Sequence, residues 1–418
     1  MRVTDLQLKS NFLLQYNKNK SALTEVQNQL ATQSKINKPS DSPADIAAVL
    51  RFRNQLKEVE SFQSNIDTSI TQVNTAINAM SNTYDVVESL KEQLRPLLNS
   101  EFPDVLYNSL PKLIDGAIDS ILVASNTQFD GKYIFAGNDY SQKPFQLNPS
   151  TNQYEVKSAS LEEKQLVEIG KNIFVDINNN GADLFNSVFK YSGNMNTAAA
   201  LGFATTQTET IFGADGAEYN FSSTMTKTAD NTFSYSYALT DTNGVAVPDG
   251  SGTSELIFDS STGKLSSIGG GDPKGFAVTV PANKVNFRVD LTNITQSTGG
   301  FNMSAGLNTE ADILNVLKSM RDKLLAREKP TTNQFVVLDS FTKTNLNEQS
   351  RAGDIYNRLE DAESVLNSSE LLAKELISKK NDVDVAKASI ELETNQYALD
   401  MLYKISARLL PQSLLNFL

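Results

Sequence analysis

The spacing of apolar residues over residues 384–418 constrains the fold of this chain most. Intervals of three, four and seven residues separate Val385, Ala388, Leu392, Leu399, Leu402 and Leu409. Such intervals are typical of a helix that packs along another helix. Two polar residues, Asn395 and Ser406, interrupt the stripe, and a single polar residue there can fix the register between helices. We therefore predict a C-terminal helix with an apolar face to bury.

Residues 11–33 form a complementary N-terminal stripe. Its apolar side chains are Leu13, Tyr16, Leu23, Val26 and Leu30, among many Asn, Gln and Lys residues. A helix this polar is only marginally stable alone, so we predict that it pairs with the C-terminal helix. Two helices paired alone bury one face each and leave apolar surface exposed, which favours contact with neighbouring copies.

Four further segments carry helical spacing between the two ends. They cover residues 47–94, 104–126, 310–327 and 338–376. Pro43 suits the first turn of the first of these helices, and Pro96 is expected to end it. Lys91 and Asn345 are polar residues within otherwise apolar stripes. The sequence predicts an antiparallel bundle that brings both ends of the chain together.

The enclosed segment has a different character. It is rich in Thr, Ser, Gly and Asn, and it alternates between polar and apolar residues over residues 233–237 and 285–291. Turn pairs occur at Asn180-Gly181, Asp215-Gly216 and Asn243-Gly244, as expected of hairpins. We predict an α+β protein: a terminal coiled coil (1–37 with 383–418), a helical stalk (38–140 with 305–382) and a β-rich outer domain (141–304).

Composition excludes several functions. The chain has no His, Cys or Trp, which removes most catalytic triads, thiol chemistry and nearly every zinc or haem site. The net charge of −12 argues against nucleic acid as the main partner. No apolar run reaches the length of a membrane span, and the first residues lack a signal-peptide core. We expect a chain that stays in the cytosol or leaves without a cleaved signal.

Three short motifs resemble ligand sites but have simpler explanations. Residues 176–181 open like a calcium loop, but the twelfth position is Ser187 instead of an acid, so a hairpin turn is the better interpretation. Residues 269–274 lack the Gly-Lys-Ser/Thr ending of a phosphate loop. The pair Glu162-Glu163 lies in a polar segment and is read as solvated charge. We predict no catalytic residue, no metal site and no cofactor.

Several motifs resemble the bacterial flagellin family. They cover roughly the first 145 and the last 110 residues, and the segment 124–137 is the most specific of them. The residues that carry the resemblance are Pro39, Ser40, Asp41, Pro43, Asn126, Gly131, Tyr133, Phe135, Gly137, Arg351, Gly353, Asn357 and Arg358. Flagellin usually has a Ser-Gly turn where this chain has Pro-Ser-Asp-Ser-Pro, which favours the hook-associated junction branch of the family.

The resemblance implies a structural, non-enzymatic subunit of the flagellum that is exported unfolded and assembled outside the cell. It implies an adaptor between hook and filament, whose ends become helical on assembly. Its implied partners are flagellin, the hook-proximal junction protein (hook-associated protein 1), its own copies in a ring, and a cytoplasmic export chaperone on the C-terminal helix. The predicted assembly interface comprises Leu6, Leu13, Tyr16, Leu23, Val26, Leu30, Leu392, Asn395, Leu399, Leu402, Leu409, Leu414, Leu415, Phe417 and Leu418.

Three alternatives remain open at this point. The chain could be the filament subunit itself, which would polymerise into long filaments. It could be a surface binding module in which Phe221, Phe233, Tyr235 and Tyr237 form a concave aromatic site in the β-rich insert, although their alternation favours a core. An enzyme within the insert is the remotest alternative, since no acid–base constellation is present.

Overall fold

The computed structural model describes residues 2–98, 104–137, 140–156 and 164–415. The side chains of residues 2–6, 8–9, 283 and 407–415 are not among the described parts. The chain has two compact units, residues 1–65 with 361–418 and residues 66–360. The boundary between the units falls inside two long helices, and each unit is described by itself below. The fold is α+β, as predicted.

Seven α-helices and two short 3-10 helices lie in the described part of the chain. Their bounds are α1 Arg2–Thr32, α2 Pro43–Leu94, η1 Arg95–Leu98, α3 Asp104–Ser125, α4 Gly181–Phe185, η2 Pro281–Asn283, α5 Ile313–Leu325, α6 Thr332–Asn381 and α7 Val385–Leu415. The predicted helices are confirmed, although α1 begins nine residues earlier than its apolar spacing indicated. Pro43 opens α2, and the α-helix ends at Leu94 just before Pro96, as the fixed φ of proline leads one to expect.

Polar residues inside the apolar stripes of α2 and α6 are explained by their partners. In the unit of residues 66–360, the Lys91 ammonium lies 2.6 Å from Asp339 and 2.7 Å from Glu88. Burial lowers the pKa of Lys91, but the hydrogen bonds to Asp339 and Glu88 outweigh burial and raise it. Asn345 is fully buried and its Oδ1 accepts from Gln349 (2.6 Å). Lys91 therefore joins α2 to α6, whereas the hydrogen bond of Asn345 lies within α6.

Helices α3 and α5 pack together in the same unit. The strongly apolar faces of both helices are buried, including Ile114 and Ile121 of α3 and Leu317 of α5. The Arg321 guanidinium of α5 donates to Asp115 of α3 (2.9 Å). A buried carboxylate, Asp312, caps α5 by accepting from the backbone N–H of Asn315 (3.1 Å), as expected of an N-cap residue.

Fifteen β-strands occupy the predicted β-rich region and its flanks in the described part of the chain. Their bounds are β1 Gln128–Phe129, β2 Lys132–Tyr133, β3 Phe145–Asn148, β4 Gln153–Val156, β5 Leu166–Gly170, β6 Ile173–Asp176, β7 Val188–Asn196, β8 Ala204–Phe212, β9 Glu218–Ala229, β10 Thr232–Asp241, β11 Ala246–Phe258, β12 Leu265–Ile268, β13 Gly275–Val280, β14 Val285–Ser297 and β15 Asn302–Leu307. Three two-stranded ribbons, β1–β2, β3–β4 and β5–β6, accompany two larger sheets.

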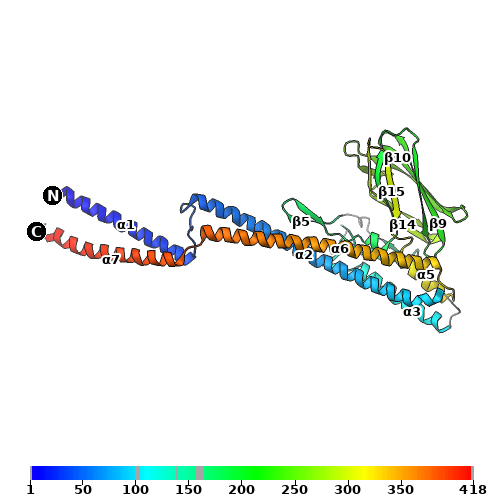
Figure 1. Ribbon diagram of the computed structural model, residues 1–418, viewed down its shortest axis with the longest axis horizontal. Coiled ribbons are helices and arrows are strands. Elements are labelled where there is room, and N and C mark those ends of the chain that lie inside the picture. The colour runs from blue at the N-terminus through cyan, green and yellow to red at the C-terminus, as the bar shows by residue number, and fades with distance from the viewer. Residues whose placement is uncertain (1, 99–103, 138–139, 157–163, 416–418) are drawn as a thin grey trace. The chain divides into compact units, whose positions relative to one another are not determined.

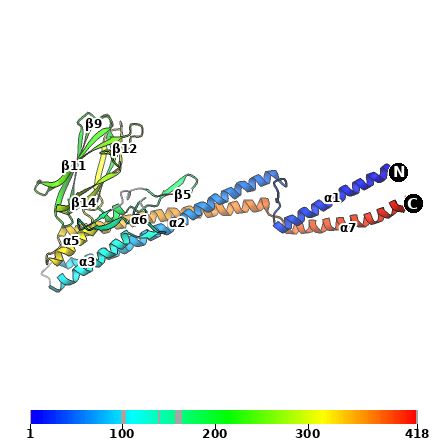
Figure 2. The ribbon, with the colours of Figure 1, turned by 180° about the vertical axis from the view of Figure 1, so that it is seen from behind.

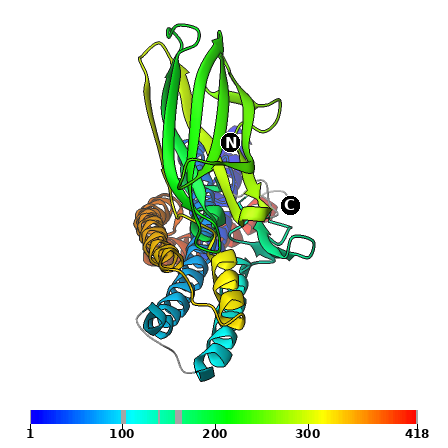
Figure 3. The ribbon, with the colours of Figure 1, turned by 90° about the vertical axis from the view of Figure 1, so that its right-hand side faces the viewer.

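The two larger sheets form a sandwich (Figure 3). One sheet is antiparallel, with the order β12-β11-β10-β9-β8, and the other has the order β13-β14-β7-β15. Strands β7 and β14 run parallel to each other, and the other neighbours are antiparallel. Alternating residues of β9 and β10 point into a shared core, in which Phe221, Phe233 and Tyr235 are almost completely buried. The alternation of residues 233–237 therefore marks a core strand.

One predicted turn is wrong. Asn180-Gly181 does not connect two strands, because Asn180 caps α4 by accepting from the N–H of Ala182 (3.0 Å). Gly181 is required there because a Cβ would lie 2.5 Å from the carbonyl oxygen of Phe135. The side chain of Asn favours both turns and helix caps, so the dipeptide alone could not separate the two. The other two pairs, Asp215-Gly216 and Asn243-Gly244, do lie in hairpin loops, between β8 and β9 and between β10 and β11.

Candidate assembly interface

The two ends of the chain form an antiparallel helical pair. Helices α1 and α7 run side by side, and the two chain ends lie at the same end of the pair (Figures 1 and 2). Val26, near the end of α1, and Ala388, near the start of α7, are buried, and so is Leu399 farther along α7. Nearer the chain ends, the hydroxyls of Tyr16 and Tyr403 are hydrogen-bonded (3.1 Å) and their rings meet edge to face at 5.8 Å. The pair is held by an apolar seam with one aromatic contact.

Most of the described residues of the predicted interface lie in the seam between α1 and α7. Half-buried or buried in the seam are Tyr16, Leu23, Val26, Leu30, Leu392, Asn395, Leu399 and Leu402. Leu13 is 56% exposed and lies away from the seam. The side chains of Leu6, Leu409, Leu414 and Leu415 lie outside the described part, as do the residues Phe417, Leu418, Glu162 and Glu163. The assembly role of the six apolar residues among them stays a prediction, as does the interpretation of Glu162 and Glu163 as solvated charge.

Helix α7 has a second apolar face that the sequence analysis missed. Ile390, Tyr397, Met401 and Ile405 follow one another at intervals of seven, four and four residues, and such intervals place them on one side of a helix. They are 66%, 66%, 44% and 48% exposed. The same periodicity that revealed the seam could have revealed this face, but the richer stripe of the seam dominated the pattern. We call these four residues the outer stripe of α7.

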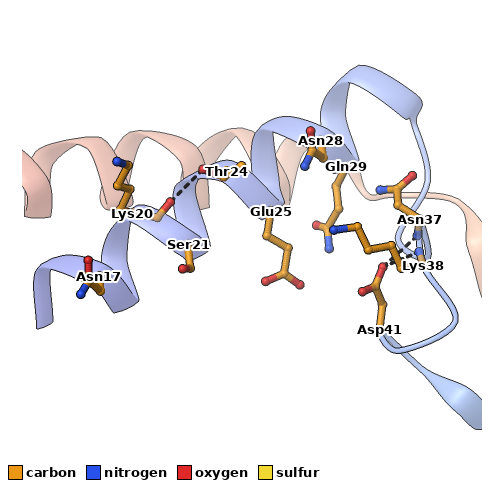
Figure 4. A pocket seen from close by; sticks show the side chains of 10 residues that line it. All are labelled: Asn17, Lys20, Ser21, Thr24, Glu25, Asn28, Gln29, Asn37, Lys38 and Asp41. Carbon is orange, nitrogen blue, oxygen red and sulfur yellow. Dashed lines mark hydrogen bonds between the residues drawn. The ribbon is translucent and has the colours of Figure 1, made fainter. Parts of the chain in front are cut away.

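Part of the outward face of α1, from Asn17 to Gln29, is different, because it is polar. A groove of about 500 Å³ runs along it toward the connection to α2 (Figure 4). Every residue that lines the groove is polar: Asn17, Lys20, Ser21, Thr24, Glu25, Asn28, Gln29, Asn37, Lys38 and Asp41. The groove on α1 therefore differs from the outer stripe of α7, although Leu13 and Leu14 of α1, beyond the groove, are 56% and 66% exposed.

The first family motif shapes the connection after α1. The Asp41 carboxylate accepts from the backbone N–H of Lys38 (2.8 Å) and of Asn37 (3.0 Å), and these hydrogen bonds lower its pKa. Pro39 and Ser40 lie in the turn that Asp41 closes, and Pro43 opens α2. The motif therefore builds a compact turn between two helices, which explains why its residue types are short, polar or proline.

The second family motif fixes the chain where α3 ends. Asn126 donates from Nδ2 to the carbonyl of Phe145 (3.0 Å) and accepts at Oδ1 from the N–H of Phe145 (3.1 Å). Gly131 and Gly137 have φ values of 73° and 63°, which favour glycine. Phe135 is fully buried and meets Phe185 edge to face at 5.5 Å. Tyr133 pairs with Gln128 in the β1–β2 ribbon.

The third family motif lies on α6. Arg351 donates to the carbonyl oxygen of Asn178 (3.0 Å) and forms an ion pair with Glu348 (2.8 Å). It thereby joins α6 to the segment before α4. Gly353 is half-buried, while Asn357 and Arg358 have exposed side chains. The second and third motifs are thus structural supports within the unit of residues 66–360, apart from the exposed pair Asn357 and Arg358.

The candidate ligand sites do not combine into an active centre. Phe221, Phe233 and Tyr235 are buried in the sandwich core, where burial raises the pKa of Tyr235, and Tyr237 is half-buried beside them. Within the described ranges, no three His, Cys, Asp or Glu side chains gather closely enough to hold a metal ion. None of the helices in those ranges is long and apolar enough to cross a membrane. The exposed feature described above that could contact another molecule is the outer stripe of α7.

The terminal helices pack on each other and leave apolar side chains of α7 exposed. Residues 3–139 match the family described as the bacterial flagellin N-terminal helical region. This match covers about a third of the chain, and it agrees with the resemblance that the motifs indicated. Members of this family are structural proteins of the extracellular flagellum and not enzymes. No curated protein sequence matches the chain.

Several solved structures are similar to this chain at low sequence identity. The flagellar junction protein FlgL of Legionella pneumophila is 16% identical, with 80% of this chain and 100% of that chain covered and a TM-score of 0.44. A putative flagellar hook-associated protein of Vibrio parahaemolyticus is 12% identical, with 82% and 100% covered and a TM-score of 0.47. FlgL of Xanthomonas campestris is 14% identical, with 85% and 99% covered and a TM-score of 0.34.

Proposed function

We propose that this chain is a hook–filament junction subunit, of the kind called hook-associated protein 3, which joins hook to filament through its terminal helices. The observation that carries the proposal is the outer stripe of α7. Four large apolar side chains are held in a row on a helix whose other face already packs on α1. Exposed apolar surface of this kind marks a site of protein association. A subunit that bridges two helical lattices needs such a surface.

The proposed partners are those that the resemblance to the flagellin family implies. We expect flagellin on one side, the hook-proximal junction protein on the other, and copies of this chain as lateral neighbours. Before export, a cytoplasmic chaperone would cover the apolar residues of α7, because an exposed stripe invites aggregation. A chain with no cysteine can also pass through an export channel unfolded without disulfides to break. We keep the three-part division of terminal coiled coil, stalk and outer domain as the functional layout.

A truncation tests the role of the ends. Removing about the last 30 residues deletes most of α7 but leaves the unit of residues 66–360 intact. We expect a folded, soluble protein that no longer restores motility to cells lacking the native subunit. Motility at the level of the full chain would overturn the proposal.

A point variant tests the outer stripe specifically. We expect Ile390→Ser to weaken assembly, since burial of a large aliphatic side chain contributes about 1.5–3 kcal/mol and two thirds of Ile390 is exposed. The loss of about 1–2 kcal/mol corresponds to association weaker by about 5- to 30-fold. Val365→Ser is the matched control, because Val365 is equally exposed (65%) on α6. Equal incorporation of both variants would contradict a role for the stripe.

Flagellin itself is the second candidate, because the family match covers a region that filament subunits also carry. The two functions predict different assemblies. A filament subunit polymerises into long filaments when seeded, whereas a junction subunit stops after a short ring. Electron microscopy of the purified chain, added to hook fragments with and without flagellin, separates the two outcomes.

A further inference from the structure

We propose that β8 is an open sheet edge to which a second copy of this chain adds its own β8, so that two sandwiches share one continuous sheet. β8 is the last strand of the five-stranded sheet, and no other strand in the described part of the chain pairs with its outer side. It lies in the unit of residues 66–360. The inference concerns the sandwich, so it depends neither on the terminal helices nor on the proposed junction function.

β8 lacks the features that commonly block the edge of a sheet. With nine residues it is longer than β12, β13 and β15, the other edge strands of the two larger sheets, which have four, six and six residues. Its pairing with β9 is continuous from Ala204 to Phe212, without a bulge. It contains no proline, glycine or lysine, and Glu209 is its one charged residue. A long and regular edge strand is a template for pairing with another chain.

The two ends of β8 show which backbone groups face its open side. The backbone N–H of Lys227 in β9 donates to the carbonyl of Phe203 (2.9 Å), so Phe203, just before β8, faces β9. The N–H of Phe212 donates to the carbonyl of Glu310 (2.9 Å), which lies outside this sheet. Successive residues of a strand direct their backbone groups to opposite sides. The odd-numbered residues of β8 therefore face β9, and the even-numbered residues face the open side.

The outward-facing backbone groups belong to Thr206, Thr208 and Thr210, whose side chains are exposed. The Thr206 hydroxyl lies 2.8 Å from that of Thr224, and the Thr208 hydroxyl lies 2.8 Å from that of Ser222. Such close side chains are typical of strand positions that share no backbone hydrogen bonds. This agrees with backbone groups that point away from β9. The edge therefore offers a second strand a row of donors and acceptors.

The sequence of β8 is complementary to itself when two copies run antiparallel and Thr208 meets Thr208. Thr206 then meets Thr210, and the paired residues exchange backbone hydrogen bonds. Threonine pairs across two strands contribute to the stability of a sheet. Each Glu209 meets Gln207, so the single charge of the strand has an amide donor opposite it. A contact centred on Glu209 would instead place two carboxylates opposite each other, which is unfavourable.

A second copy is the partner that this complementarity selects. Pairing of β8 with itself relates the two copies by a two-fold axis through Thr208. The two sandwiches then point in opposite directions, whereas the neighbours within one ring all point the same way. The contact therefore forms between free copies. It covers the edge of the free copy and removes a site of uncontrolled strand pairing.

Cysteine substitutions in the full-length chain, which has no cysteine of its own, test the centre of the contact. The two Cα atoms of residue 208 would lie about 5.5 Å apart, within reach of a disulfide. We expect Thr208→Cys to form a disulfide-linked dimer under mild oxidation. Thr210→Cys is the matched control, because Thr210 is also exposed on β8 but would meet Thr206 of the second copy. We expect the control to crosslink at least tenfold more slowly.

Substitutions of Gln207 test the contact in two opposite directions. Gln207→Lys would place a lysine opposite each Glu209, and pairs of opposite charge across two strands are stabilising. We expect the dissociation constant of the dimer, measured by sedimentation velocity, to fall by about two- to thirtyfold. Gln207→Glu would place like charges opposite each other and should raise the constant by a similar factor. Thr253→Lys, at an exposed position of β11 away from β8, should leave it unchanged.

Three results would overturn the inference. The first is a full-length chain that stays monomeric up to its solubility limit. The second is equal crosslinking of Thr208→Cys and Thr210→Cys. The third is a dissociation constant that Gln207→Lys and Gln207→Glu change in the same direction.

One further variant separates this contact from the outer stripe of α7. Ile390→Ser should leave the β8 dimer intact, because Ile390 lies on α7 and not in the sandwich. A dimer that is lost in Ile390→Ser but kept in Gln207→Glu would show that copies associate through α7, and would contradict pairing through β8. Motility is not part of this comparison, so the outcome is distinct from that of the proposed junction function.

Discussion

The buried cap of α5 makes the stability of this protein depend on pH in a direction that is unusual for a carboxylate. Asp312 is 5% exposed and caps α5, with its carboxylate accepting from the N–H of Asn315. Burial raises the pKa of Asp312 to about 7, against the opposing effect of hydrogen bonds from the N–H groups of Asn315 and Leu314. In the unfolded chain the same carboxyl titrates near its usual value of 3.8.

Whether the protein becomes more or less stable as the pH rises depends on whether the folded or the unfolded chain holds the Asp312 proton. Between about pH 4 and pH 7 the folded chain keeps the Asp312 proton and the unfolded chain releases it, so the free energy of unfolding falls as the pH rises. The slope is about 1.4 kcal/mol per pH unit. Over roughly three units the loss is about 4 kcal/mol. Below pH 4 and above pH 7, Asp312 contributes no further change.

Asp312→Asn isolates this contribution, because asparagine also caps helices but does not titrate. We expect the free energy of unfolding of the native chain to fall relative to that of the variant between pH 4 and pH 7. Urea unfolding at pH 4, 5.5, 7 and 8, followed by the fluorescence of tyrosines in the unit of residues 66–360, measures the difference. Because the native chain and the variant share all other carboxylates, the contributions of those groups to the pH dependence cancel when the two free energies of unfolding are subtracted. A difference that is constant across this range would refute the reasoning.

Two other predictions concern packing and turns in the same unit. Phe185→Ala should lower the free energy of unfolding by about 3–5 kcal/mol, because Phe185 is buried against Phe135, Phe145 and Phe341; a thermal midpoint within a degree of the native value would contradict this. Gly216→Ala should destabilise more than Gly244→Ala. Both glycines have φ of 80°, but of the two only Gly216 would place a Cβ in a clash, 1.9 Å from the Thr331 hydroxyl. If urea unfolding showed the same decrease in the free energy of unfolding for both variants, the clash at Gly216 would be contradicted.

The sequence predicts the helices well because their signals are local and repeated. Over α2 the apolar spacing continues for a dozen turns, and proline at each end sets the limits. Ambiguity appears where one residue type serves two purposes. Asn180 was interpreted as part of a hairpin turn and instead caps α4. The decisive contact, between Gly181 and the carbonyl of Phe135, joins residues that are distant in sequence and leaves no local signal.

Only part of the candidate interface was predicted, because periodicity is a local signal. Periodicity identified the seam residues, such as Leu392 and Leu399, because they share a stripe. It could not tell which stripe the chain buries itself, since an apolar stripe has the same spacing whether its partner is internal or external. Only exposure in the folded chain separates them: Leu399 is 7% exposed and Tyr397 is 66% exposed. The bridge between Ser34 and Asp382 was not predicted either, because it is formed by backbone atoms.

The unequal outer faces of the terminal pair bear on the kind of assembly it can form. If both α1 and α7 were apolar on the outside, pairs would stack on either side without a defined end. The outer stripe lies on α7, whereas the groove on α1 is lined by polar residues such as Lys20 and Glu25, with Leu13 and Leu14 exposed beyond it. A contact that uses the stripe is therefore one-sided. If the stripe meets its own copy the result is a two-fold dimer, whereas a stripe that meets a different surface of its neighbour generates a ring or a helix. A junction subunit requires the second arrangement, so its outer stripe should be covered by a surface other than another outer stripe.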